Sequence, residues 1–493
     1  MRYLYTGPDA KKIDEHAMEV VGMPSLVLME RAAMTVAKLL LERESADARF
    51  LAVCGTGNNG GDGMAVARIL HEMGYKACIT IVGYPDSMSN EAKKQAEIAV
   101  GCHVPVIPLS SIKDNEFDVI IDAIFGIGLS RDVTDVYEQV IEDINSSDAI
   151  IYALDVPSGI HSGTGKVLGC AVKAETTVTF GVNKLGLILH PGNSYAGEVI
   201  IADIGFPKES VKSIKTPYHH FEPDDISKLL PARPDRSHKG DYGHVLIVAG
   251  SEQMGGAAYL SALGAYRMGA GMVKVISPIA NRDFLMGRLP EVLFDEPESL
   301  EEQLEWADAI VVGPGLGLDD DAQKTVETII NNSYVPTVID ADAIRLCRNI
   351  TNKLSENFIL TPHMKEMSYL TGKSVDDILN DTVNCARDAA YDFDAIIVCK
   401  DFRTVVSDGS ECYINVSGNS GMATAGSGDV LSGMIGALLG QGMETFDAAK
   451  LGVYIHGLAG DIQAKLMSKN ALMASDIADG IGKVITDQLF NLS

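Results

Sequence analysis

Short apolar runs alternate with amphipathic stretches along the whole chain, and this alternation predicts its secondary structure. The apolar runs predict buried strands at 50–54, 117–121, 149–154, 243–249, 272–276, 306–312, 336–339, 358–360 and 395–399. Helical spacing of apolar residues predicts helices at 6–41 (broken by Gly22-Met23-Pro24), 64–73, 257–268 and from 364 onward. Strands that alternate with helices predict an α/β protein with mainly parallel sheets and helices on both faces.

The pattern loosens between residues 202 and 240, and the segment LLPARPDRSHKGDYG (229–243) carries two prolines, glycines and mixed charges. A chain of 493 residues is long for a single hydrophobic core, so two or three domains are expected. We place the boundary near 212–220 and predict a first domain at 1–215 and a second at 220–493. The first has the strand–glycine–helix opening of a Rossmann-like, three-layer α/β/α fold.

Charge and cysteine usage restrict the partners and the cellular compartment that are expected of this protein. The formal net charge is -27, which argues against nucleic acid or an anionic membrane as a partner, because both need a basic face. The eight cysteines form no CxxC pair, which indicates reduced thiols. There is no apolar signal core at the N-terminus and no run long enough to span a membrane, so a cytoplasmic protein is expected.

Polar residues follow the predicted strands of the first half. The strand at 50–54 runs into the loop GTGNNGGDG (55–63), whose spacing is neither GxGxxG nor a Walker loop. Because ligands bind at the carboxyl ends of strands in open α/β sheets, Asn59, Asp122, Asp155 and Ser158 are expected on one rim. Each of them alone could instead be a capping or turn residue.

The stretch NSGMATAGSGDVLSGMIGALLGQG (419–442) predicts a glycine-rich loop that feeds the N-terminus of a buried helix. Free backbone N–H groups at such a terminus bind anions, and glycines allow a phosphate to approach the backbone. Asp429 would lie in the first turn, where a carboxylate can take a proton from an attacking hydroxyl. The alternative is that Ser427 or Asp429 only caps a core helix.

In the first half, GTGNNGGDG, DAIFGIGL, LDVPSGIHSGTG and TVTFGVNKLGL, with GMPSLVLMERAA upstream, resemble the epimerase domain of the NAD(P)H-hydrate repair proteins over roughly residues 5–210. The resemblance implies interconversion of the R and S forms of hydrated NADH and NADPH beside a bound potassium ion. It implies Asn59, Asp122 and Ser158 as potassium ligands, and Asp155 as the acid/base group at C6. Oxygen-only ligands suit such a hard ion.

The same resemblance implies two substrate-binding loops besides Asp155. Their residues are Asn58, Asn59, Gly60, Gly61 and Asp62, and Gly126, Ile127, Gly128, Leu129, Ser130, Arg131 and Asp132. In the family a basic residue usually stands immediately before the glycine that follows the GIGL-type segment. Here Arg131 is offset by one place, so its role is open.

In the second half, HKGDYGHVLIVAGS, GPGLG, IDADA, LTPH and the 419–442 stretch resemble the dehydratase domain of the same proteins, a branch of the ribokinase-like kinases, over roughly residues 225–490. The resemblance implies that ADP or ATP with Mg²⁺ phosphorylates the C6 hydroxyl of the S form, with Asp429 as base, before phosphate leaves. It implies hydrate contacts at Ala257, Gly317, His363 and Asp429. It implies nucleotide contacts at Lys400, Asp401, Phe402, Arg403, Thr404, Gly426, Ser427 and Gly428.

Two other interpretations compete with this bifunctional enzyme. One is a kinase for a small molecule such as a vitamin precursor or sugar, which a stable phosphoester product would favour. The other is that the first half is a binding or regulatory module, against which the intact Asn59, Asp122 and Asp155 argue. ADP and ATP are not distinguished by the sequence, and a homo-oligomer is compatible with an acidic chain that has apolar helices.

Overall fold

The computed structural model describes residues 1–114, 117–348 and 354–490. The chain divides into two compact units, one spanning Tyr3–Thr216 and the other comprising Pro217 onward together with Met1–Arg2. This division is geometric, and the assignment of one activity to each unit is a proposal. The α/β class and the mainly parallel sheets predicted from the apolar pattern are confirmed.

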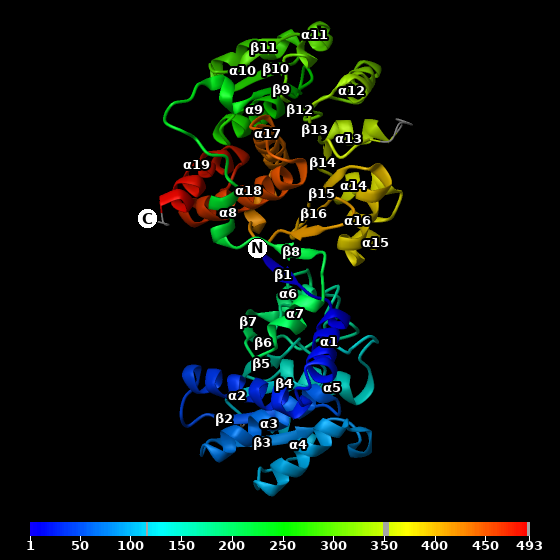
Figure 1. Ribbon diagram of the computed structural model, residues 1–493, viewed down its shortest axis with the longest axis vertical. Helices are drawn as coiled ribbons and strands as arrows, with labels where there is room; N and C mark the ends of the chain where they lie inside the picture. Colours follow the sequence, from blue (N-terminus) through cyan, green and yellow to red (C-terminus); the bar gives the residue numbers. More distant parts are fainter. Residues whose placement is uncertain (115–116, 349–353, 491–493) are drawn as a thin grey trace. The chain divides into compact units, whose positions relative to one another are not determined.

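The N-terminal unit is built on a parallel sheet with the strand order β3-β2-β4-β5-β6-β7 (Figure 1). The strands are β2 (Arg49–Cys54), β3 (Lys76–Ile81), β4 (Val119–Ala123), β5 (Ile150–Leu154), β6 (Thr176–Phe180) and β7 (Glu198–Ala202). The helices are α1 (Gly7–Glu15), α2 (Ser25–Arg43), α3 (Asn58–Glu72), α4 (Asn90–Gly101), α5 (Asp135–Asn145), α6 (Gly192–Ala196) and α7 (Lys208–Ser213). A π-helical turn, η1 (His16–Val20), continues α1. The opening strand β1 (Arg2–Leu4) is not part of this sheet; it is the edge strand of the larger sheet, next to β8 (Tyr218–His220).

Successive residues of β2 face opposite sides of this sheet. Phe50 and Ala52 pack in the core cluster that also holds the buried face of α2 and α3. Leu51 and Val53 pack in a second cluster with the buried face of α5. Because strand side chains alternate and both faces are covered, the sequence reads as a continuous apolar run, and the unit has three layers.

Helix α3 begins at Asn58, six residues before the start that the sequence predicts, so most of the glycine-rich segment is helical. Close packing explains the glycines. A Cβ on Gly60 would lie 1.9 Å from the carbonyl oxygen of Gly55, and one on Gly63 would lie 2.4 Å from the Cβ of Ala123. Without side chains here the helix can approach the ends of β2 and β4 closely.

The C-terminal unit contains a sheet with the order β8-β17-β16-β15-β14-β13-β12-β9-β10-β11. The strands are β8 (Tyr218–His220), β9 (His244–Val248), β10 (Met272–Ile276), β11 (Leu293–Asp295), β12 (Ala309–Val312), β13 (Thr337–Ile339), β14 (Phe358–Leu360), β15 (Ile396–Cys399), β16 (Val405–Ser407) and β17 (Cys412–Ile414). Neighbouring strands pair in parallel along the run β15-β14-β13-β12-β9-β10-β11, and β17 also pairs in parallel with β8. The pairs β15–β16 and β16–β17 are antiparallel.

The helices of this unit surround one large core. They are α8 (Pro223–Leu229), α9 (Gly255–Arg267), α10 (Arg282–Arg288), α11 (Leu300–Leu304), α12 (Asp320–Asn332), α13 (Asp342–Cys347), α14 (Met364–Thr371), α15 (Val375–Asn380), α16 (Thr382–Phe393), α17 (Ser427–Gly440), α18 (Thr445–Met467) and α19 (Ala474–Phe490). Helix α17 is buried almost all round, as an apolar, glycine-spaced sequence predicts. Gly433 lets it pack against α9, because a Cβ there would lie 1.9 Å from the carbonyl oxygen of Ser261.

Three details of the predicted elements are wrong. The strand predicted at 306–312 begins only at Ala309, and Trp306 instead stacks on His244 with ring centroids 4.8 Å apart. Asp122 lies within β4 and not after it. The β16–β17 hairpin, whose strands have three residues each, was not predicted.

Candidate functional site

In the N-terminal unit, the three predicted potassium ligands meet around the main chain of Phe125. The Asp122 carboxylate is fully buried and accepts from the backbone N–H of Ser158 at 2.8 Å and its hydroxyl at 2.6 Å. The Ser158 oxygen accepts from the Phe125 N–H at 2.8 Å, and Asn59 Nδ2 donates to the Phe125 carbonyl at 3.0 Å. Asn59, Asp122 and Ser158 therefore form one oxygen-rich cluster.

This cluster fits a hard monovalent cation in its chemistry. It offers a carboxylate, a hydroxyl, an amide and a carbonyl oxygen and no sulfur or imidazole. The described residues include no group of three or more His, Cys, Asp or Glu side chains that could hold a metal ion.

Asp155 takes a different set of partners. It directly follows β5 with a φ of +64°, a conformation that costs a non-glycine residue energy and persists only where the surroundings impose it. Its Oδ1 lies 2.6 Å from Nζ of Lys184 and accepts from Thr179 Oγ1 and the Phe180 N–H, both at 3.2 Å. Lys184 is 2% exposed, so the pair is buried.

A cavity of about 790 Å³ opens beside these groups. From the two predicted substrate loops it is lined by Asn58, Asn59, Asp62, Gly126, Ile127, Gly128, Leu129, Ser130 and Arg131, and Asp155 lines it as well. Gly60, Gly61 and Asp132 do not line it. Gly60 and Gly61 serve the packing of α3, because a Cβ on either would meet Gly55 or Met29.

Two lining residues, Asp14 and Lys184, were not predicted as site residues. Asp14 lies on α1, where burial raises its pKa to about 6 and the nearby charge of Asp155 adds to the rise. Lys184 falls inside the quoted segment TVTFGVNKLGL, and a lysine within an otherwise apolar segment is the signal that could have identified it.

In the C-terminal unit, α17 begins as predicted. Gly426 caps it in the left-handed conformation with a φ of +87°, and Ser427 is its first residue. A Cβ on Gly428 would lie 3.2 Å from Nζ of Lys400, so the ammonium lies against the first turn of the helix. The oxygen of Ser427 lies 3.4 Å from Nε2 of His456, which burial keeps neutral by lowering its pKa to about 4.

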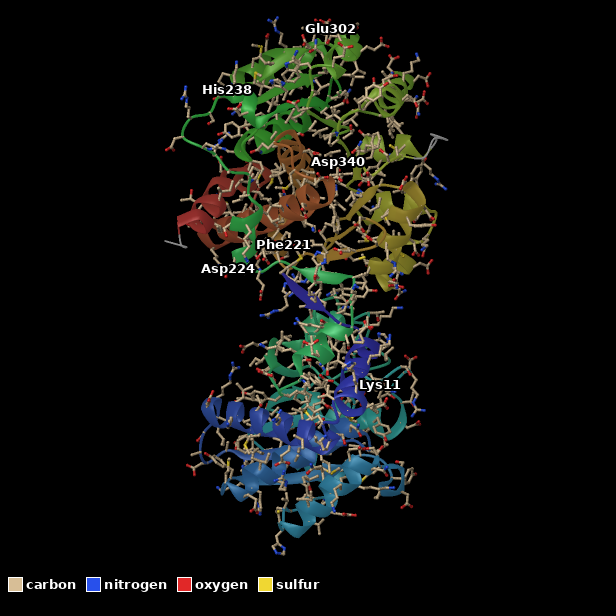
Figure 2. The ribbon with its side chains drawn as sticks, viewed as in Figure 1. Lys11, Phe221, Asp224, His238, Glu302 and Asp340 are labelled. Carbon is tan, nitrogen blue, oxygen red and sulfur yellow. The ribbon has the colours of Figure 1, made fainter. Side chains whose placement is uncertain are left out.

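Asp429 is half-buried in this first turn. Burial raises its pKa to about 7, Asp340 adds to the rise, and Lys400 opposes it. Lys400 Nζ lies 2.8 Å from Oδ1 of Asp340, the side chain labelled in Figure 2. Asp340 is 1% exposed and also accepts from Thr361 Oγ1 at 2.6 Å. A carboxyl group with a pKa near neutrality beside a cation can serve as a general base.

The remaining predicted hydrate contacts come from three different elements. His363 caps α14, its Nδ1 accepting from the N–H groups of Lys365 and Glu366 at 3.1 Å. Its Nε2 points to Glu366 at 3.4 Å, and the side chain is 52% exposed. The Gly317 N–H donates to Asp342 at 2.9 Å, and Ala257 lies near the start of α9.

The segment from Lys400 to Thr404 connects β15 to β16. Arg403 donates to the Val416 carbonyl at 3.0 Å, and its guanidinium lies over the Phe402 ring at 4.7 Å. Asp401 and Phe402 are exposed, and Thr404 is buried. Sequence reasoning missed Asp340 and Glu366, although IDADA and LTPH were recognised. The position of Asp340 directly after β13 was the available signal, whereas Glu366 lies in the first turn of α14.

The comparisons with known proteins cover both units. Residues 245–483 match the model of the NAD(P)H-hydrate dehydratase family, and residues 25–186 match that of the YjeF-related protein N-terminus. A protein of Thermofilum pendens named bifunctional NAD(P)H-hydrate repair enzyme Nnr is 37% identical over 97% of this chain and 95% of its own. A Coxiella burnetii protein of the same name is 35% identical over 97% of this chain and 98% of its own.

A solved structure is similar to the C-terminal unit. The ADP/ATP-dependent NAD(P)H-hydrate dehydratase of Bacillus subtilis, co-crystallized with ATP/Mg²⁺, is 29% identical with a TM-score of 0.51, and the match covers 55% of this chain and 98% of that one. Within the described residues, no helix is both long and apolar enough to cross a membrane.

Proposed function

This chain belongs to the family of bifunctional NAD(P)H-hydrate repair enzymes, and we propose that it restores hydrated NADH and NADPH in two steps. The N-terminal unit interconverts the R and S hydrates. The C-terminal unit uses ADP or ATP to convert the S hydrate back to NADH or NADPH. The two units of the fold, each with a polar site at the carboxyl ends of parallel strands, support this division.

For dehydration, the difficulty is that hydroxide is a poor leaving group. Asp429 takes the proton of the C6 hydroxyl as its oxygen attacks the terminal phosphorus of the nucleotide. The backbone N–H groups at Gly426, Ser427 and Gly428 stabilise the charge of the transferred phosphoryl group. Phosphate then leaves C6 as the ring nitrogen supplies its electron pair, and loss of the C5 proton restores the double bond.

The position of Asp429 carries this proposal. It places a carboxyl group with a pKa of about 7 in the first turn of α17, beside the Lys400–Asp340 pair. A capping role alone requires neither a raised pKa nor a buried lysine at that turn. Mg²⁺ is expected to arrive with the nucleotide, because it is held in such sites by one or two carboxylates together with phosphate oxygens. Asp340 is the carboxylate that would hold it, and the ion would neutralise phosphate charge.

For epimerisation, we assign the hydrate to the cavity lined by Asn58, Asp62 and Asp155. Asn59, Asp122 and Ser158 would hold potassium at the edge of this site, which would stabilise negative charge on the bound hydrate. Asp155 then moves a proton at the C6 centre.

The test is the absorbance of the full chain with hydrated NADH, K⁺, Mg²⁺ and either ADP or ATP. Recovery of the NADH band establishes dehydration and identifies the phosphoryl donor. Complete conversion of a mixture of both epimers, faster than their uncatalysed exchange, establishes epimerisation. No recovery with either nucleotide, together with a stable phosphoester from another small molecule, would favour the kinase interpretation with a non-catalytic N-terminal unit.

A further inference from the structure

Three carboxyl groups and one ammonium share the wall of the N-terminal cavity. Asp14 comes from α1, Asp62 from α3, Asp155 from the end of β5, and Lys184 follows β6. The other titratable groups on the wall are Lys11, Glu15, Glu19, Glu91 and Arg131. Since the cavity is the proposed epimerase site, these groups decide which proton transfers it can perform.

Lys184 pairs with Asp155 and orients its carboxyl group. Its ammonium lies 2.6 Å from Asp155 Oδ1 and also donates to the Phe180 carbonyl at 2.8 Å. With Thr179 and the Phe180 N–H, three donors converge on Oδ1. Among the described residues, none donates to Oδ2, so this oxygen is available on the cavity wall to accept a proton.

Asp62 lies four residues into α3 and has the opposite surroundings. Within the described part of the chain, neither a cation nor a hydrogen-bond donor contacts its carboxyl group. Burial raises its pKa well above the ordinary value, and the charges of Asp155 and Asp14 add to the rise. Two carboxyl groups that line one cavity with such different partners can divide the acid and base roles between them.

We propose that Asp62 is a second catalytic residue of the epimerase site, which gives a proton to the C6 hydroxyl while Asp155, oriented by Lys184, receives one. The proposal rests on the epimerase function proposed above. It makes Lys184 a positioning residue, because it acts on the hydrate only through Asp155.

The proton transfers define a complete reaction. Asp62 protonates the C6 hydroxyl, the C6–O bond breaks, and the ring-nitrogen lone pair forms a C=N bond as water leaves. A second water then attacks C6 from the opposite face. The C=N electron pair returns to nitrogen, and Asp155 accepts the proton of that water. The opposite epimer forms, and exchange of one proton with solvent returns both carboxyl groups to their starting states.

An isotope experiment on the unmodified chain tests this route. The R hydrate of NADH is incubated in H₂¹⁸O with K⁺ and without nucleotide, so that dehydration cannot occur. Because the entering water comes from the face opposite to the leaving one, each enzymatic epimerisation should place one ¹⁸O at C6, measured by mass spectrometry after subtraction of the uncatalysed reaction. Epimerisation without ¹⁸O uptake would overturn the proposal, whereas no epimerisation above the background would overturn the epimerase function itself.

Substitutions test the residues. Asp62→Asn, which keeps the size of the side chain, should lower kcat/KM for epimerisation about 100-fold and remove the fall in rate at high pH. Lys184→Met should lower kcat for epimerisation with little change in KM, because Asp155 then loses the contact that orients it, and Lys184→Arg should restore much of the rate. Asp86→Asn, at an exposed carboxylate on the same unit, is the matched control. A wild-type pH profile in Asp62→Asn would contradict the role of Asp62.

Discussion

The ammonium of Lys400 lies 2.8 Å from Oδ1 of Asp340 and bridges the ends of β15 and β13 at the first turn of α17. Burial opposes the charge of Lys400, but the carboxylates of Asp340 and Glu366 hold its pKa above the ordinary value. The cation therefore stays charged in a site that must receive the phosphates of a nucleotide. Asp340 is 1% exposed, so water cannot replace the ammonium of Lys400 as the partner of its charge.

We expect Lys400→Met to destabilise the C-terminal unit by about 3 kcal/mol, since it leaves Asp340 as a buried charge without a partner. Urea unfolding followed by circular dichroism measures the loss. The double variant Lys400→Met/Asp340→Asn removes the charge as well and should recover part of the stability. If the double variant were as unstable as the sum of both single variants, the two side chains would not be coupled.

Asp429→Asn should lower the rate of dehydration about 10²- to 10⁴-fold while nucleotide binding is retained, because only the proton acceptor is lost. Single-turnover recovery of NADH measures the rate, and calorimetric titration with ATP measures binding. A near-normal rate in this variant would rule out Asp429 as the base.

The pH profile of the wild-type chain gives an independent check of the same residue. Burial raises the pKa of Asp429 to about 7, and the base works only when deprotonated. The rate of dehydration should therefore rise with pH and level off above about 7. A base with the ordinary pKa of a carboxyl group would instead give a flat profile between pH 5 and 8.

Much of this architecture follows from local sequence. Apolar runs closed by glycine or a polar residue located β2, β4, β5, β9, β10 and β12 through β15, but not β3, β6 or β7. The start of α17 at Gly426 and Ser427 follows from its glycine-rich approach. The start of α3 does not follow from local sequence, because glycine usually ends a helix. The glycines of α3 are instead selected by close contacts with Gly55 and Ala123, which form only in the folded chain. Lys184 and Asp340 were not predicted as site residues for a similar reason. Their importance depends on partners 29 and 60 residues away in the chain, Asp155 and Lys400 respectively.

Asp155→Asn should abolish most of the epimerisation and leave dehydration of the pure S hydrate unchanged. Asparagine is the better substitution than alanine, because its amide oxygen can still accept from Lys184, which is 2% exposed. The R-to-S ratio is followed by chromatography without nucleotide, and NADH recovery from the S hydrate is measured in the same preparation. Loss of both activities together would indicate a folding or coupling effect and not a catalytic one.

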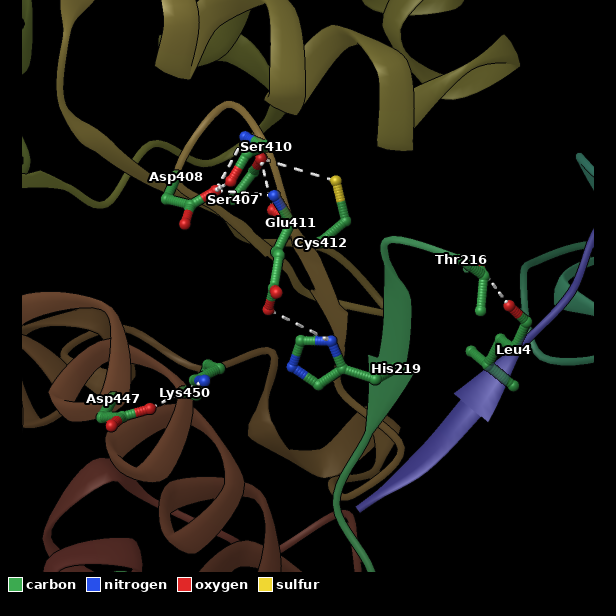
Figure 3. Close-up of polar contacts among 10 residues, drawn as sticks. All are labelled: Leu4, Thr216, His219, Ser407, Asp408, Ser410, Glu411, Cys412, Asp447 and Lys450. Carbon is green, nitrogen blue, oxygen red and sulfur yellow. Dashed lines mark hydrogen bonds and ion pairs between the residues drawn. The ribbon is translucent and has the colours of Figure 1, made fainter. Parts of the chain in front are cut away.

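Buried histidines should make the C-terminal unit sensitive to acid. His219 on β8 is 1% exposed and lies 4.0 Å from Glu411 (Figure 3), and burial lowers its pKa to about 4, with the charge of Lys450 adding to the effect. The unfolded chain binds a proton below pH 6.5, and the folded chain does not until about pH 4. This contribution to stability is therefore complete above pH 6.5 and lost as the pH falls toward 4.

The loss should be at most about 1.4 kcal/mol per pH unit for each such histidine. Urea midpoints measured between pH 7 and 5 give the slope, and His219→Gln should reduce it because glutamine does not titrate. His238→Gln is the matched control, since His238 is 78% exposed and its substitution should leave the slope unchanged. An equal slope in His219→Gln and the wild type would show that another group accounts for the acid sensitivity of this unit.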